Sequence, residues 1–344
     1  MIKKAYLAKN ILASNFGRLA SPYKITFVLT YRCNLKCKIC RIWGKDIQDE
    51  LDITKIEKLF KGLNNLSWLD LTGGEITLRE DLFDVVRVIA KQARKMLVLH
   101  ISSNGQLPDI LFKLAKEIVK LGLVPVINVA LDGPREFNDQ LKGANGAYEN
   151  SISAFRKLKE LKQVNSFLSC TVSRHNIKHI DDLLVNLRKD LPKFSYSDFH
   201  FNIFHNSSHY YANAQTDAFP EVGFEGLKKY FDLGLKGGFI KNLLTRLYIK
   251  GLRQYCSGER FPVRCQALNS TCFISPDGSI YPCGLYDRRI GNLKDYNYDL
   301  MKLWISKESI EARKEIVNMK CQGCWSPCEA YPAILGRLIK GAYI

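Results

Sequence analysis

Six short apolar runs, separated by segments in which apolar residues recur every three or four positions, constrain the fold of this 344-residue chain most strongly. The runs indicate strands at 25–29, 68–71, 97–102, 125–131, 167–172 and 198–204. The recurrence between them is the spacing of one helix face. Strands that alternate with helices assemble into parallel sheets. The sequence therefore predicts an α/β fold, built either as an open doubly wound sheet or as part of a barrel.

Distinctive residues directly follow four of the predicted strands. They are Cys33, Cys37 and Cys40 after the first strand, residues 72–75 after the second, residues 102–105 after the third and Asp132 after the fourth. In parallel α/β folds the carboxyl ends of the strands meet at one rim, where ligands bind and catalysis takes place. We therefore expect one site, formed by four successive loops.

The three cysteines of the first loop are the strongest chemical signal in the chain. Closed iron-sulfur clusters usually take four cysteine thiolates. Three thiolates from one short loop can hold three irons of a [4Fe-4S] cluster and leave the fourth iron open to a small molecule. The alternatives are a structural zinc site or three unrelated buried thiols.

The Cys-x3-Cys-x2-Cys spacing in CNLKCKIC, the GGE sequence after the second strand and the six β/α units resemble the radical S-adenosylmethionine (SAM) superfamily over residues 23–204. The resemblance implies a partial (β/α)6 barrel of the TIM type, a [4Fe-4S] cluster on the three cysteines, and SAM on its open iron. It also implies reductive cleavage of SAM to a 5′-deoxyadenosyl radical that abstracts hydrogen from a substrate, with an electron donor such as ferredoxin or flavodoxin. Such radical chemistry belongs to the cofactor, while the protein supplies ligation and orientation.

Five residues on the second and third loops match positions that contact SAM in the superfamily. They are Gly73, Gly74, Glu75, Ser102 and Asn104. Gly73 and Gly74 allow close approach of the backbone, and Glu75 can balance the amino group of SAM. The resemblance implies that Ser102 and Asn104 contact the ribose or the carboxylate.

Seven of the eleven cysteines follow residue 255, where the pattern changes to short strands and turns. The run CFISPDGSIYPC predicts a hairpin that turns at Pro276, Asp277 and Gly278. This small cysteine-rich α+β extension resembles the SPASM and twitch domains of radical SAM enzymes, which implies an auxiliary [4Fe-4S] cluster. The expected ligands are Cys265, Cys283, Cys321 and Cys324, and the alternative set is Cys265, Cys272, Cys283 and Cys328. A zinc ribbon fits paired cysteines on a hairpin equally well.

These features divide the chain into four segments. They are a basic leader at 1–22, a radical SAM barrel at 23–208, a bridging segment with a basic amphipathic helix at 209–255, and an iron-sulfur domain at 256–344. No secretory signal is evident, and a long chain without one keeps its thiols reduced in the cytosol. We therefore expect a cytoplasmic protein.

Lysine and arginine outnumber aspartate and glutamate by 51 to 34, and the resulting formal charge of +17 favours anionic partners. Three basic segments, 1–24, 239–253 and 334–340, also carry apolar stripes at helical spacing. Such helices can rest on the inner surface of an anionic membrane or simply pack on the barrel. Membrane contact would favour a lipid or lipid-linked glycan as substrate, and its absence would favour a peptide.

Asp132 after the fourth strand and His205 after the sixth are the polar groups best placed to meet substrate or carry a proton. Each can equally be a loop cap or a satisfied side chain of the rim. We expect a radical SAM enzyme, an oxidoreductase or transferase that abstracts hydrogen. The alternative is a nonenzymatic iron-sulfur or zinc protein that binds nucleic acid through its basic surface, although the sequence contains no recognisable binding module.

Overall fold

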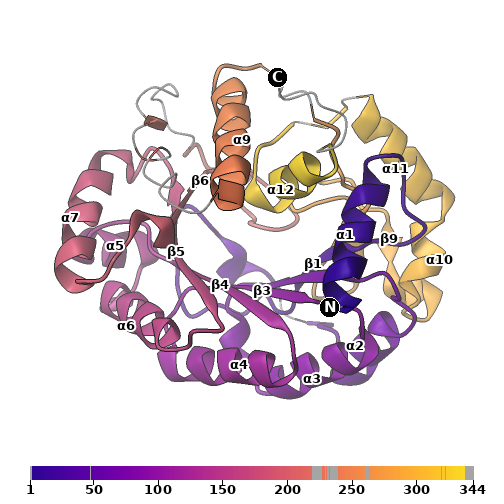
Figure 1. Ribbon diagram of the computed structural model, residues 1–344, viewed down its shortest axis with the longest axis horizontal. Helices are drawn as coiled ribbons and strands as arrows, with labels where there is room; N and C mark the ends of the chain where they lie inside the picture. Colours follow the sequence, from indigo (N-terminus) through magenta and orange to yellow (C-terminus); the bar gives the residue numbers. More distant parts are fainter. Residues whose placement is uncertain are drawn as a thin grey trace.

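Six parallel strands form the centre of the molecule and are confirmed at the predicted places (Figure 1). They are β1 (Lys24–Val28), β2 (Trp68–Thr72), β3 (Val98–Ser103), β4 (Val124–Ala130), β5 (Asn165–Val172) and β6 (Phe199–Ile203). The computed structural model describes residues 2–46, 48–218, 227, 228, 230, 232, 239–259, 263–318, 320, 321 and 323–337. Neighbouring strands pair in chain order from β1 to β6.

Helices α2 to α7 follow the strands in order, and α2, α3, α4, α6 and α7 form an arc along the outer face of the sheet, as Figure 1 shows, whereas α5 packs beside the cysteine loop. They are α2 (Ile53–Phe60), α3 (Leu82–Gln92), α4 (Pro108–Lys120), α5 (Arg135–Lys142), α6 (Ala147–Lys159) and α7 (Ile180–Asp190). The start of α2 follows from its local sequence, because the Asp52 side chain accepts a hydrogen bond from the Lys55 N–H at 2.9 Å. Since the helices of this arc lie on one face, the sheet curves into a partial barrel, and the doubly wound alternative is wrong.

Successive residues of the strands face opposite sides of the sheet, as the geometry of a strand requires. Leu69 and Leu71 of β2 are fully buried in the core between sheet and helices. Asp70 lies between them in the sequence and faces the inside of the barrel, as do His100 of β3 and Asn128 of β4. The inner face of the barrel is therefore more polar than the outer one.

The cysteine-rich extension continues the same sheet. Its strands are β7 (Thr271–Ile274), β8 (Ser279–Tyr281) and β9 (Gly291–Asn292), and its helices are α10 (Leu300–Trp304), α11 (Lys307–Val317) and α12 (Pro327–Leu335). β7 pairs in parallel with β1, with Lys24 opposite Thr271, and β8 pairs antiparallel with β7. The predicted hairpin is thus confirmed, and Gly278 adopts the left-handed conformation at its turn, with φ 82°.

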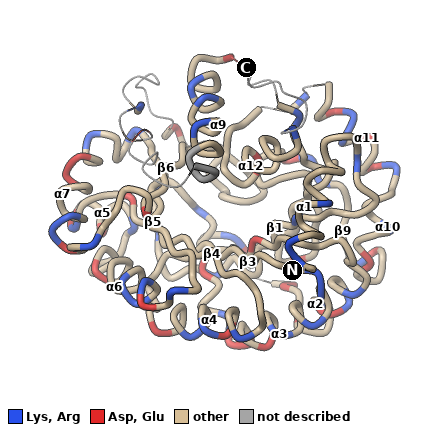
Figure 2. The backbone as a smooth tube through the Cα atoms, viewed as in Figure 1, with Lys and Arg blue, Asp and Glu red and all other residues tan. Residues whose placement is uncertain are grey.

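Two of the three basic amphipathic segments form helices whose apolar side chains partly pack inside the protein. Leu7 and Ile11 of α1 (Ile2–Ser14) line a cavity in the barrel, and Leu247 and Leu252 of α9 (Phe239–Cys256) are buried. Figure 2 shows basic residues along α9. The side chains of Ile240 and Lys241, and residues Leu338, Ile339 and Lys340, lie outside the described part. No helix among the described residues is both long and apolar enough to cross a bilayer, and membrane contact stays a prediction.

Candidate active site and iron-sulfur sites

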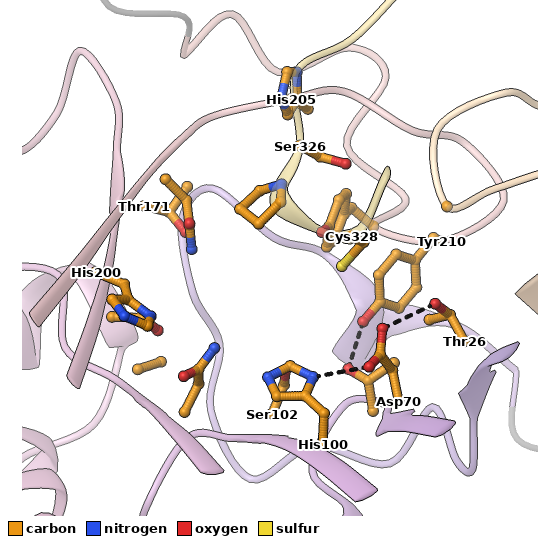
Figure 3. Close-up of a pocket in the computed structure, with 18 of the residues that line it drawn as sticks. Thr26, Asp70, His100, Ser102, Thr171, His200, His205, Tyr210, Ser326 and Cys328 are labelled. Carbon is orange, nitrogen blue, oxygen red and sulfur yellow. Dashed lines mark hydrogen bonds and ion pairs between the residues drawn. The ribbon is translucent and has the colours of Figure 1, made fainter. Parts of the chain in front are cut away.

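A cavity of about 660 Å³ lies inside the barrel, between the inner faces of the strands, the cysteine loop after β1, and α12 (Figure 3). The side chains of Cys33, Cys37 and Cys40 line it, and so do Ser102 and Asn104 at the end of β3. Small-molecule sites have volumes of about 300–1,000 Å³. The first three predicted loops therefore share one cavity of suitable size for a ligand.

The cysteine loop is held by backbone hydrogen bonds to the end of α5. The N–H groups of Lys36 and Lys38 donate to the carbonyls of Lys142 and Leu141, both at 3.0 Å. Burial raises the pKa of the Cys37 thiol to about 11. The loop is therefore positioned by the fold before any metal binds, and binding of a metal must displace protons from buried thiols.

Gly73 and Gly74 are required where the loop after β2 packs against the cysteine loop. A Cβ atom on Gly73 would lie 2.5 Å from the carbonyl oxygen of Thr30, and one on Gly74 would overlap the backbone of Arg32. In this arrangement the Gly74 N–H donates to Thr30 at 2.9 Å and the Glu75 N–H donates to Arg32 at 2.7 Å. The glycines therefore seat one loop against the other, which the sequence alone did not indicate.

Glu75 is fully buried, and its carboxylate joins the loops after β2 and β3 instead of lining the cavity. It accepts hydrogen bonds from Thr77, from the Ser103 hydroxyl at 3.0 Å and from the Asn104 N–H at 2.6 Å. Burial raises its pKa, although these donors oppose the shift. The side chain of Asn104 reaches the cavity and lies 3.8 Å from the Cys33 sulfur. Glu75 thus positions Asn104 and has no direct access to the cavity.

Asp132 is buried in an ion pair with Lys142 and accepts a hydrogen bond from the Thr171 N–H at 2.7 Å. Its side chain does not line the cavity, whereas Lys142 does. Burial alone would lower the pKa of Lys142, but the ion pair with Asp132 and the nearby Cys37 raise it above its ordinary value. Its carboxylate, paired in this way, holds Lys142 near the cysteine loop, and a catalytic role for Asp132 stays a prediction.

His205 lies on the cavity wall, at the end of β6 (Figure 3). Burial lowers its pKa to about 4, so the ring is neutral at pH 7. The hydroxyl of Tyr255 lies 3.3 Å from its Nδ1 atom. His205 can therefore contact a ligand, although its low pKa makes it a weak base, and its catalytic role stays a prediction.

Lys24, Asp70 and His100 form a group that the sequence analysis missed. The Asp70 carboxylate lies 2.7 Å from the Lys24 ammonium and 3.2 Å from His100 Nδ1, and it accepts a hydrogen bond from the Trp68 indole at 2.6 Å. Burial would raise the pKa of Asp70, but Lys24 and His100 hold this pKa well below its ordinary value. Figure 3 shows the His100 ring at the cavity, bonded to Asp70 on one side.

A signal for this group exists in the sequence. Asp70 stands at the centre of WLDLT and His100 at the centre of VLHISS, each as a polar residue in an apolar strand. Positions two residues apart in a strand share a face, and Asp70 pairs with His100 across β2 and β3. Polar residues at equivalent positions of neighbouring strands therefore mark the inner wall of the barrel.

Electrostatic interactions between thiols link four C-terminal cysteines, Cys265, Cys283, Cys321 and Cys324. The charge of Cys321 raises the pKa of both Cys265 and Cys324, while Cys265 and Cys324 raise that of Cys283, in each case after the larger effect of burial. Cys328 lies instead beside Lys24 and the cavity. These four are the expected ligands of the auxiliary cluster.

Backbone N–H groups point at two of these sulfur atoms. The Ala267 N–H donates to Cys265 at 3.5 Å and the Tyr286 N–H donates to Cys283 at 3.4 Å. Cys272 is a member of the alternative set. Burial raises the pKa of its thiol most, and the charges that act on it are those of Glu329 and Lys24, with none from the other described cysteines. The electrostatic interactions therefore group the thiols in the first of the two predicted ways, and their role as ligands stays a prediction.

Two family models match the chain where these sites lie. A model described as the radical SAM superfamily matches residues 27–186, and a SPASM model, described as an iron-sulfur cluster-binding domain, matches residues 265–325. The chain belongs to the radical SAM superfamily. Its C-terminal extension is a SPASM-type iron-sulfur domain.

Curated relatives of this radical SAM protein include the AdoMet-dependent heme synthase of Oleidesulfovibrio alaskensis, which is 25% identical over 87% of this chain and 79% of the relative. The Fe-coproporphyrin III synthase of Methanosarcina barkeri is 28% identical over 50% of this chain, and the match spans only 43% of that relative. Among solved structures, native anSMEcpe with bound AdoMet has a TM-score of 0.56 at 18% identity, covering 84% of this chain and 83% of the other. That structural similarity confirms the fold.

The residues of both sites fit the clusters of the superfamily. Among the described residues, no three Cys, His, Asp or Glu side chains converge on a single metal ion. Cys33, Cys37 and Cys40 line one cavity of about 660 Å³, as thiols that hold a cluster open to a small ligand must. The grouped C-terminal thiols and the N–H donors aimed at their sulfur atoms suit a fully ligated cluster.

Proposed function

We propose that the chain is an enzyme that cleaves SAM reductively and abstracts hydrogen from a substrate bound in the barrel. One observation carries the proposal: the three thiols of the cysteine loop, the Asn104 side chain and the His100 ring all open on the same cavity of about 660 Å³. Cofactor, hydrogen donor and proton acceptor would therefore meet in one space.

The cluster and SAM, when bound, supply a 5′-deoxyadenosyl radical that removes a hydrogen atom from the substrate. In this proposal Cys33, Cys37 and Cys40 hold the cluster. Asn104 and Ser102 contact SAM from the end of β3, and Glu75 fixes the Asn104 backbone through its 2.6 Å hydrogen bond. The chain's part is to orient these groups and to keep water from the radical.

His100 is the group best placed to accept a proton when a substrate radical is oxidised. Its Nδ1 atom lies 3.2 Å from the Asp70 carboxylate, which fixes the orientation of the ring at the cavity wall. Lys24 holds Asp70 ionised from the other side. His205, with a pKa of about 4, is the weaker candidate.

The lining of the cavity favours an uncharged reacting group on the substrate. Among the described lining residues Lys142 is the only lysine or arginine, and Asp132 neutralises it. The high positive charge of the chain therefore lies mainly outside the cavity. A peptide, whose backbone amides and uncharged side chains form hydrogen bonds without a net charge, suits this lining better than a phosphorylated molecule. The relatives named heme synthases make a tetrapyrrole the competing substrate.

The surface charge suits a different partner. A formal charge of +17 favours encounter with an acidic protein, and ferredoxins or flavodoxins of that kind would deliver the electron that SAM cleavage needs.

The test is anaerobic reconstitution with iron and sulfide, followed by dithionite, SAM and measurement of 5′-deoxyadenosine. Cys40→Ala should abolish 5′-deoxyadenosine formation, because two thiolates no longer hold the open cluster. Cys256→Ala is the matched control, since Cys256 is a half-buried cysteine that belongs to neither cysteine group, and it should leave formation unchanged. Absence of 5′-deoxyadenosine from a fully loaded wild-type protein would contradict the proposal.

A further inference from the structure

Arg313 of α11 is a buried cation without an acidic partner. Only 6% of the residue is exposed, and no described ion pair involves it. Its Nη1 atom donates to the Ala267 carbonyl at 2.8 Å. Its Nε and Nη2 atoms have no hydrogen-bond partner among the described residues.

Such an arrangement is costly unless an anion completes it. A buried charge is normally paired, and a buried N–H group is normally hydrogen-bonded, because neither can interact with water. Arginine cannot escape by losing its proton at ordinary pH. The environment of Arg313 therefore indicates an anionic acceptor beside its free N–H groups.

The nearest group of suitable chemistry is the set of four C-terminal cysteines. The guanidinium of Arg313 lies against the Cys265 thiol. The two residues also share Ala267, whose carbonyl accepts from Arg313 at 2.8 Å and whose N–H donates to the Cys265 sulfur at 3.5 Å. A [4Fe-4S] cluster on four thiolates is anionic and presents several sulfur acceptors.

We propose that Arg313 is the counter-charge of the auxiliary cluster and donates hydrogen bonds to its sulfur atoms, which raises the reduction potential of the cluster. The inference rests on the auxiliary cluster of the proposed function. Net charge and hydrogen bonds to sulfur are two of the factors that set cluster potentials, and a fixed cation stabilises the reduced, more negative state. The auxiliary cluster thereby becomes a better acceptor for the electron that a substrate radical releases.

Glu329 lies near the same cysteines, and its negative charge would lower the reduction potential that Arg313 raises. The test therefore compares the potentials of variants with that of a parent protein. The parent protein is the full chain with Cys33, Cys37 and Cys40 all changed to Ala, which leaves the auxiliary cluster as the only expected iron-sulfur signal. Arg313→Met removes the charge and the donors at similar volume. Arg264→Met is the matched control, because Arg264 is next to Cys265 in the chain but is exposed.

The readout is a redox titration followed by EPR spectroscopy of the reduced cluster. Arg313→Met should lower the potential enough to change the ratio of oxidised to reduced cluster at least tenfold, about 59 mV for a one-electron couple. Arg264→Met should change it much less, because water screens its charge. Equal potentials in Arg313→Met and the parent, or equal shifts in the two arginine variants, would overturn the inference.

A measurement on the parent protein covers the case in which Arg313→Met does not load iron. With arginine labelled by ¹⁵N in the guanidinium group, pulsed EPR of the reduced cluster should show a ¹⁵N coupling, and its absence would refute the contact. Iron analysis shows separately whether the auxiliary cluster is present and whether Arg313 acts on it. A parent that binds no iron contradicts the auxiliary cluster itself, whereas a loaded cluster without coupling or potential shift contradicts only the role of Arg313.

Discussion

Asp70→Asn should destabilise the protein more than almost any other single change of charge, because it leaves the Lys24 ammonium buried without its carboxylate. The side chains of Lys24 and Asp70 are 1% and 5% exposed, and their charged atoms lie 2.7 Å apart. Removal of one partner from a buried pair typically costs about 3–5 kcal/mol. Lys24→Met should cost less than Asp70→Asn, since Asp70 keeps the His100 and Trp68 contacts.

The assay is urea unfolding of the metal-free chain under reducing conditions, followed by tryptophan fluorescence. The double variant Lys24→Met, Asp70→Asn should be more stable than Asp70→Asn alone, because the ammonium that loses its Asp70 partner is removed as well. Asp84→Asn is the control, since its ion pair with Arg87 is exposed to water and should contribute no measurable stability. Additive losses in the double variant, or a loss in Asp70→Asn no larger than that of the control, would refute the reasoning.

Three further predictions concern the cavity and the cysteines. Burial lowers the pKa of His205 from 6.5 to about 4, so as the pH falls this histidine is protonated in the unfolded chain before it is protonated in the folded one. The free energy of unfolding should therefore decrease by about 3 kcal/mol from pH 6.5 to pH 4. His205→Asn should remove this dependence in stability measurements across that pH range. Gly74→Ala should lower iron content and the urea midpoint, because its methyl group overlaps the backbone of the cysteine loop, whereas Gly44→Ala, with open space around it, should change neither. Cys321→Ala should lower the iron content below the about eight irons per chain of two [4Fe-4S] clusters, because one iron of the auxiliary cluster loses its thiolate, whereas Cys328→Ala should leave the iron content unchanged, and the reverse result would favour the alternative ligand set.

The strands could be read from the sequence because strands of a parallel sheet covered by helices are nearly continuous apolar runs. The hairpin of β7 and β8 could also be predicted from the sequence, since Pro276, Asp277 and Gly278 are residue types that favour a tight turn. Both signals are local. They depend on residues that are close together in the chain.

The parts that could not be predicted depend on contacts between distant residues. Lys24 meets Asp70 from 46 positions away, and Asp132, in the loop after β4, meets Lys142 at the end of α5. Glu75 follows the pattern of a ligand-contacting residue, yet its position behind Ser103 and Asn104 turns it into a support for the next loop. A motif identifies such residues, but only the packing decides whether they face the ligand or hold a neighbour.

The pairing of β7 with β1 has a consequence for the integrity of the whole chain. β1 carries the cysteine loop at its end and has β2 on one side and β7 on the other. A protein truncated before residue 263 would leave β1 as an open edge, with unpaired backbone groups that invite association with other chains. The same ladder joins the strand that precedes the cysteine loop to the hairpin that lies between Cys265 and Cys283, so the spacing of these two parts of the chain is set by the sheet and does not depend on a hinge.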